Sequence, residues 1–147
     1  DFPDSTLKDS LITRAEKELN KGIDLYNNWN SRFSGLDANQ IEREIEETFY
    51  EGLEEYTPEE RAKYLDNRIK EIEEAQIELN RRLSVSYTNL GIIYRHKEMY
   101  DSAVIFYQKA LKLWDRNLTA ENNMNILLGR PERKQNFIDK MFPRERL

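Results

Sequence analysis

The sequence has 147 residues but no cysteine, a single histidine (His96), five glycines and four prolines. The absence of cysteine excludes disulfides, thiolate metal sites and a cysteine nucleophile. One histidine excludes zinc sites built from several histidines. So few glycines and prolines leave little material for the turns that the many short strands of an all-β fold require. The expected fold class is therefore all-α.

Long apolar runs are also missing, since none approaches the roughly 20 residues that a membrane-spanning helix needs. No signal peptide is visible at the start of the sequence. Because the chain begins at Asp1 rather than at Met, we expect either a processed protein or a fragment of a longer one. The location stays open between the cytoplasm and, if an export signal or anchor preceded Asp1, the cell envelope or periplasm.

Charge is plentiful, at 35% of residues with a net charge of −5, and it is unevenly spread. Nine glutamates stand between Glu42 and Glu60 against the single Arg43, and this half would repel nucleic acid phosphates. We interpret the glutamates as a solvated helix face, with an acidic docking surface as the alternative. From Arg130 onward six basic residues outnumber three acidic ones. A solvated last helix is favoured there over contact with anionic lipid, RNA or an acidic partner, so no nucleic acid partner is expected.

Two helices are predicted in the first third of the chain from apolar residues at helical spacing. The first spans about 6–29, and the second spans about 38–56 after a capping box formed by Asp37 and Gln40. The apolar residues of the first are Leu7, Leu11, Ala15, Leu19, Ile23 and Tyr26. Those of the second are Ile41, Ile45, Phe49, Leu53 and Tyr56.

A third helix, predicted over about 58–82, begins at Thr57-Pro58-Glu59-Glu60, where Thr57 can cap and Pro58 suits the first helical position. Its apolar residues alternate in steps of three and four, which forms a heptad seam interrupted by one polar residue. The seam consists of Ala62, Leu65, Ile69, Ile72, Gln76, Leu79 and Leu83. It favours packing on the first two helices of the same chain, and a homodimer through 62–83 is the alternative. Whether 57–96 forms one helix or two stays open.

The pattern changes at Ser84, where Tyr87-x-x-Leu90-Gly91-x-x-Tyr94 is followed by Ala103-x-x-x-Tyr107-x-x-Ala110. Gly91 and Ala103 have almost no side chain, so two helices can approach closely there. This pattern resembles the tetratricopeptide repeat (TPR) over residues 84–117, although Tyr87 replaces the usual Trp and Asp115 stands where the family has a closing Pro. The residues assigned to packing within the repeat are Tyr87, Leu90, Gly91, Tyr94, Tyr100, Ala103, Tyr107 and Ala110.

The resemblance implies an all-α fold of antiparallel helical hairpins with TPR-like right-handed stacking, here joined to N-terminal helices outside the repeat. It also implies a protein-binding function, as an adaptor or scaffold, through a groove lined by the first helix of the hairpin (about 85–96). The positions of this sequence that match the groove are Val85, Thr88, Ile92, Arg95 and His96. Clamping of a partner's terminal carboxylate would need Lys at position 88 and Asn at position 92, so an apolar segment with an acidic group is the expected partner. The alternative is that the chain's own helices cover Val85 and Ile92.

Beyond the second helix of the hairpin (about 99–114), the sequence predicts a degenerate repeat or cap. One helix is expected over about 118–128, ended by Gly129. A last helix is expected after Pro131, with Phe137, Ile138, Met141 and Phe142 as its apolar residues. We therefore divide the chain into an N-terminal helical region, 1–83, and the hairpin with its C-terminal helices, 84–147.

Catalytic motifs are absent from the sequence, which contains no G-x-x-x-x-G-K-[ST], G-x-G-x-x-G or G-x-S-x-G. A serine triad would have to use His96 with Ser84, Ser86 or Ser102, and nothing supports such an arrangement. Asn117-Leu118-Thr119 matches a glycosylation acceptor, but Asn117 is better interpreted as a helix cap. We expect no enzyme activity, no cofactor and no metal site.

Overall fold

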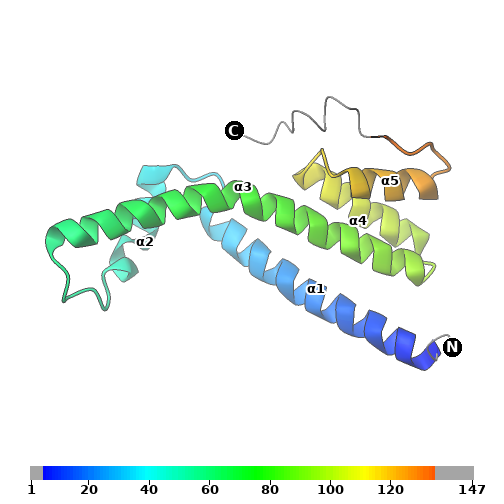
Figure 1. The fold of residues 1–147 in the computed structure, drawn as a ribbon, viewed down its shortest axis with the longest axis horizontal. Helices are drawn as coiled ribbons and strands as arrows, with labels where there is room; N and C mark the ends of the chain where they lie inside the picture. Colours follow the sequence, from blue (N-terminus) through cyan, green and yellow to red (C-terminus); the bar gives the residue numbers. More distant parts are fainter. Residues whose placement is uncertain (1–4, 135–147) are drawn as a thin grey trace.

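The computed structural model describes residues 5–134, which form five α-helices and no strand within that range. These helices are α1 (Ser5–Phe33), α2 (Ala38–Phe49), α3 (Pro58–His96), α4 (Tyr100–Leu113) and α5 (Leu118–Leu127). In Figure 1, α3 runs along the whole molecule, α2 lies beside its first half, and α1, α4 and α5 lie beside its second half. The predicted all-α fold is confirmed.

Helix α3 is continuous over 39 residues, which settles whether 57–96 forms one helix or two. Thr57 and Glu60 form the predicted capping box at its start, with Pro58 in the first turn. Ser84 and Ser86, which could have interrupted the helix, both lie within it. The Ser86 hydroxyl donates to the Arg82 carbonyl at 3.1 Å, and Ser84 is fully buried. The predicted division between residues 83 and 84 therefore falls inside an unbroken helix.

The first half of α3 forms a hydrophobic core with α2 and the end of α1. This core consists of Phe33, Ile41, Ile45, Leu65, Ile69 and Ile72. Much of the predicted heptad seam is thus occupied within the chain. Its polar interruption, Gln76, holds the α1–α2 connection, because its side chain accepts from the Gly35 amide at 2.8 Å and donates to the Leu36 carbonyl at 2.9 Å.

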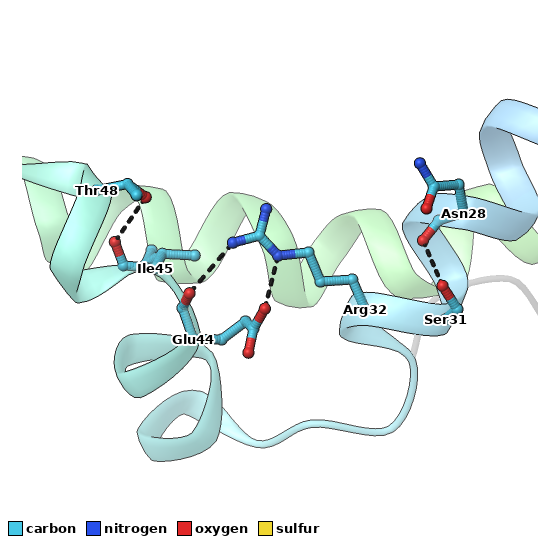
Figure 2. A network of polar contacts seen from close by, with 6 residues as sticks. All are labelled: Asn28, Ser31, Arg32, Glu44, Ile45 and Thr48. Carbon is cyan, nitrogen blue, oxygen red and sulfur yellow. Dashed lines mark hydrogen bonds and ion pairs between the residues drawn. The ribbon is translucent and has the colours of Figure 1, made fainter.

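Helix α2 begins at the predicted Asp37–Gln40 capping box, but it ends at Phe49 rather than near residue 56. Gly52 adopts a φ of 80°, a left-handed conformation that an α-helix does not contain. Figure 2 shows how α2 is also attached to α1. The Arg32 guanidinium donates to the Glu44 carboxylate at 2.7 Å and to the Glu44 carbonyl at 3.2 Å.

Helix α1 packs on α3, but not through the whole apolar stripe that the sequence predicted. Ile23 is buried beside Leu83 and Leu90 of α3, with Leu19 and Tyr26 packed against them. By contrast, Leu7 and Leu11 are 53% and 56% exposed. Most residues of the predicted stripe are spaced by four, and because an α-helix has 3.6 residues per turn, such a stripe winds gradually around the helix. The side of α1 that faces α3 contains Leu19, Ile23 and Tyr26, which are spaced by four and then by three residues. Glu16, in the first half of α1, forms an ion pair with Lys97 at the end of α3.

Candidate functional site

The predicted repeat folds as a hairpin of two closely packed helices, formed by the last third of α3 and by α4. Gly91 lies directly against the ring of Tyr107, and a Cβ placed on Gly91 would come within 2.6 Å of Tyr107 Cδ1. Tyr107, Ala103 and Ala110 are completely buried. The small residues thus allow the close approach that the sequence predicted, because any side chain at position 91 would occupy the space of the Tyr107 ring.

A buried polar network fixes the junction of α3, α4 and α5. The Asn117 amide donates to the hydroxyl of Ser84 at 2.8 Å and to that of Thr88 at 2.9 Å. Ser84 in turn donates to the Ala110 carbonyl at 2.7 Å. Asn117 also caps α5 by accepting from the Ala120 amide at 3.1 Å, as predicted. Because Asn117 is only 3% exposed and uses both ends of its amide, it is not accessible for glycosylation.

Helix α5 lies beside the first helix of the hairpin and forms one border of the predicted groove. It packs on α4 through Ala120, Met124 and Leu127, which join the Tyr107 core. On the side of α5 that faces α3, the Asn123 side chain accepts a hydrogen bond from Arg95 at 2.8 Å. Ile126 follows Asn123 by three residues, on the same side of α5, and is 50% exposed.

The five predicted groove residues differ widely in their accessibility. Val85 is 46% exposed and His96 is also exposed, so both are open to a partner. Ile92 is partly buried against the Tyr107 core, and Arg95 is partly buried and bonded to Asn123. Thr88 is 2% exposed, and its hydroxyl donates to the Ser84 carbonyl and accepts from Asn117. Thr88 is therefore a structural residue that a partner cannot reach, which corrects its prediction as a contact residue.

The sequence analysis missed the contribution of α5, whose exposed Ile126 adds an apolar side chain beside the groove. It also missed Asn122, whose amide binds the chain that returns after Gly129. The Asn122 side chain accepts from the Arg133 amide at 2.7 Å and donates to the Arg133 carbonyl at 3.0 Å. The Arg133 guanidinium pairs with Glu121 at 3.1 Å. No spacing signal in the sequence links residues 122 and 133.

The segment after α5 differs from its prediction as far as it is described. Residues 131–134 have no regular secondary structure, although Pro131 was predicted to open a helix. The apolar residues assigned to that helix, Phe137, Ile138, Met141 and Phe142, lie outside the described residues. The apolar stripe of a last helix therefore remains a prediction.

Electrostatic contacts join α1 to the end of the hairpin. Glu16 accepts a hydrogen bond from Lys97, and this bond, with a second one involving Tyr94, lowers the pKa of the Glu16 carboxyl. The same contact with Glu16 raises the pKa of the Tyr94 hydroxyl. Burial alone raises the pKa of Tyr107, whose hydroxyl has no hydrogen-bond partner among the described residues. These contacts concern the packing of α1 and α4 against the last third of α3.

Comparison with known proteins identifies the hairpin. A family model described as tetratricopeptide repeat matches residues 84–117, the same 34 positions that carry the sequence pattern. Residues 84–117 are therefore recognised as one tetratricopeptide repeat. No match was found among curated proteins or among solved structures.

The repeat indicates a protein–protein interaction module, because TPR domains generally bind other proteins and do not catalyse reactions. Helices α1 and α5 pack against the hairpin and cover apolar faces that a single repeat could not bury by itself. Among the described residues, no helix is long and apolar enough to cross a membrane. The repeat itself makes a protein the expected class of partner.

Proposed function

We propose that the protein acts as an adaptor or scaffold that binds a partner polypeptide on the face shared by α5 and the first helix of the repeat. The observation that carries this proposal is the exposure of apolar side chains there. Val85 is 46% exposed on α3 and Ile126 is 50% exposed on α5, and Ile92 keeps part of its surface accessible. Apolar anchors of this kind, bordered by polar groups, are typical of protein-binding surfaces.

The polar groups at the border favour a partner segment that carries an acidic residue. His96 is exposed at the end of α3, next to Lys97, and Arg95 uses only part of its five N–H donors on Asn123. The residues that would clamp a terminal carboxylate are absent, because Thr88 and Ile92 occupy the positions of Lys and Asn. An apolar helix or an extended segment with an acidic side chain fits this surface better than a free C-terminus.

The proposal is tested by using the folded chain as bait in lysate from its own source. The variant Val85→Glu, His96→Glu changes two exposed side chains of the proposed surface without touching the Tyr107 core. Ile105→Glu on α4 is the control, since Ile105 is 51% exposed and its change from an apolar side chain to Glu is the same as the one made at Val85. Circular dichroism establishes that all three proteins are equally helical.

A partner that the parent and Ile105→Glu capture, and that the double variant loses, would support the proposed surface. Equal capture by all three proteins would contradict it and would direct attention to the acidic surface of α2. Loss of capture in Ile105→Glu instead would place the contact on α4.

A further inference from the structure

A pocket of about 580 Å³ lies beside the middle of α3, one turn before Val85 and outside the surface proposed above. Three parts of the chain surround it, namely α3, the connection between α1 and α2, and the turn between α4 and α5. Its lining residues are Ser34, Gly35, Gln76, Ile77, Asn80, Arg81, Leu113, Trp114, Asp115 and Arg116.

The pocket exists because α3 extends far beyond the repeat. Helix α1 ends at Phe33, beside the middle of α3 (Figure 1). The Gln76 side chain holds the following turn by accepting a hydrogen bond from the Gly35 amide at 2.8 Å. Helix α4 ends at Leu113, where the extended backbone of Trp114 directs the chain toward α5. Two connections thus meet the same stretch of α3 from different sides, and none of the five described helices fills the space between them.

The walls of this pocket combine apolar surface with the charge of Arg81, whose guanidinium has no partner among the described residues. Ile77 is 51% exposed, and Trp114 and Leu113 are partly buried. Arg81 is partly buried as well, yet its side chain makes no hydrogen bond or ion pair with any residue between 5 and 134. The neighbouring Arg82, by contrast, forms an ion pair with Glu78 of the same helix at 3.0 Å. Asp115 lines the pocket but forms no ion pair with Arg81.

We propose that this pocket binds a carboxylate next to an apolar group, namely an acidic residue adjacent to an aliphatic or aromatic residue of a partner polypeptide. The planar guanidinium of Arg81 matches a carboxylate with two parallel hydrogen bonds. The neighbouring apolar side chain would cover Ile77 and pack on Trp114. The volume lies within the range of about 300–1,000 Å³ that is usual for ligand pockets.

The experiment uses N-acetylphenylalanine as the probe, because it contains one free carboxylate next to one apolar side chain. Binding is followed by the amide and indole resonances of the ¹⁵N-labelled protein. Trp114 reports on the pocket, and Trp29, which packs against Phe33 at 5.0 Å between ring centroids, is the internal reference. A saturable shift of the Trp114 indole is expected, with a dissociation constant on the order of 1 mM, and Trp29 should not move.

Two comparisons test the carboxylate contact. Arg81→Gln, and separately N-acetylphenylalaninamide in place of the acid, should each weaken binding about ten-fold. Arg82→Gln is the matched control and should bind the acid as the parent does. The inference is overturned if Trp114 does not respond, if the amide binds as tightly as the acid, or if Arg81→Gln and Arg82→Gln behave alike. None of these variants alters Val85, His96 or Ile126, so the result is independent of the function proposed above.

Discussion

The buried hydroxyl of Tyr107 is an unfavourable feature of the hairpin. The residue is completely buried against Gly91, and its hydroxyl has no hydrogen-bond partner within residues 5–134. An unpaired buried hydroxyl loses its hydration without compensation, at a cost of about 1–3 kcal/mol. Tyr107 therefore favours the folded state through its ring and opposes it through its oxygen.

We predict that Tyr107→Phe raises the free energy of unfolding by about 1 kcal/mol, because the ring is kept and the unpaired oxygen is removed. Urea denaturation measures the change. Tyr64→Phe, at a residue 41% exposed, is the control and should alter stability little. A Tyr107→Phe variant that is less stable than the parent would show that the hydroxyl is paired after all.

Asn117 makes the opposite kind of contact, since its side chain uses every polar atom at the junction of three helices. Asn117→Ala removes a helix cap and the donors to two buried hydroxyls, so we predict a loss of about 2–3 kcal/mol in the free energy of unfolding. Asn117→Asp keeps the acceptor for the Ala120 amide but loses the donors. Equal urea midpoints for Asn117→Ala and the parent would contradict this role.

At the level of single residues, the sequence predicted the helix-capping residues correctly, but it did not predict which side chains a partner can reach. Asn117, Asp37 and Thr57 were all identified as caps, because the residue types and spacings of a cap are local. Thr88 was predicted as a contact residue, yet it is buried. Its burial depends on Asn117, which lies 29 positions away in the sequence, and no local pattern contains that information.

At the scale of elements, the contact between α1 and the end of α3 depends on charge. Glu16 and Lys97 form an ion pair whose side chains are only 19% and 31% exposed, respectively. The pair lowers the pKa of Glu16, so the folded state holds the carboxylate in its ionised form more strongly than the unfolded chain does. This stabilisation is complete above the ordinary glutamate pKa of about 4.3 and is lost as the pH falls through the folded-state pKa.

We therefore predict that Glu16→Gln lowers the free energy of unfolding by up to about 1 kcal/mol at neutral pH. The difference from the parent should shrink below about pH 4 and vanish once Glu16 is protonated in both states. Glu18→Gln is the matched control, because Glu18 pairs with Lys21 on the exposed surface of the same helix. Urea denaturation at several pH values measures both variants. A pH-independent difference for Glu16→Gln would contradict an electrostatic role.

Most helices could be predicted from periodicity, but their ends and faces could not. The end of α2 was placed too late because Leu53 and Tyr56 continue the apolar spacing, whereas Gly52 breaks the helix before them. The apolar face of α1 was misplaced near its start, where Leu7 and Leu11 are exposed. Periodicity shows that a helix has an apolar side, and only the position of α3 decides which side is buried.

At the scale of the whole molecule, the core around Ile72 and the core around Tyr107 are separate clusters joined by α1 and α3. The unbroken α3 was the feature that the sequence left open, since Ser84 and Ser86 are compatible with either a helix or a break. In the folded protein, the Ser84 hydroxyl donates to the Ala110 carbonyl and the Ser86 hydroxyl donates to the Arg82 carbonyl. The hydrogen bond from Ser84 to α4 and the hydrogen bond from Ser86 within α3 thus allow α3 to continue through both serines.

The arrangement of two cores on one helix predicts how the protein opens. Ile72→Ala should destabilise the core of α2 by about 2–5 kcal/mol, because it leaves a cavity at a residue only 2% exposed. Hydrogen exchange should then accelerate in α2 and in α3 up to about residue 75, whereas the amides of α4 should keep most of their protection. Ala103→Gly is the reciprocal variant, and it should accelerate exchange mainly in the hairpin. Equal acceleration in both halves for either variant would show that α3 couples the two cores into one cooperative unit, and the division predicted at residues 83 and 84 would then have no energetic meaning.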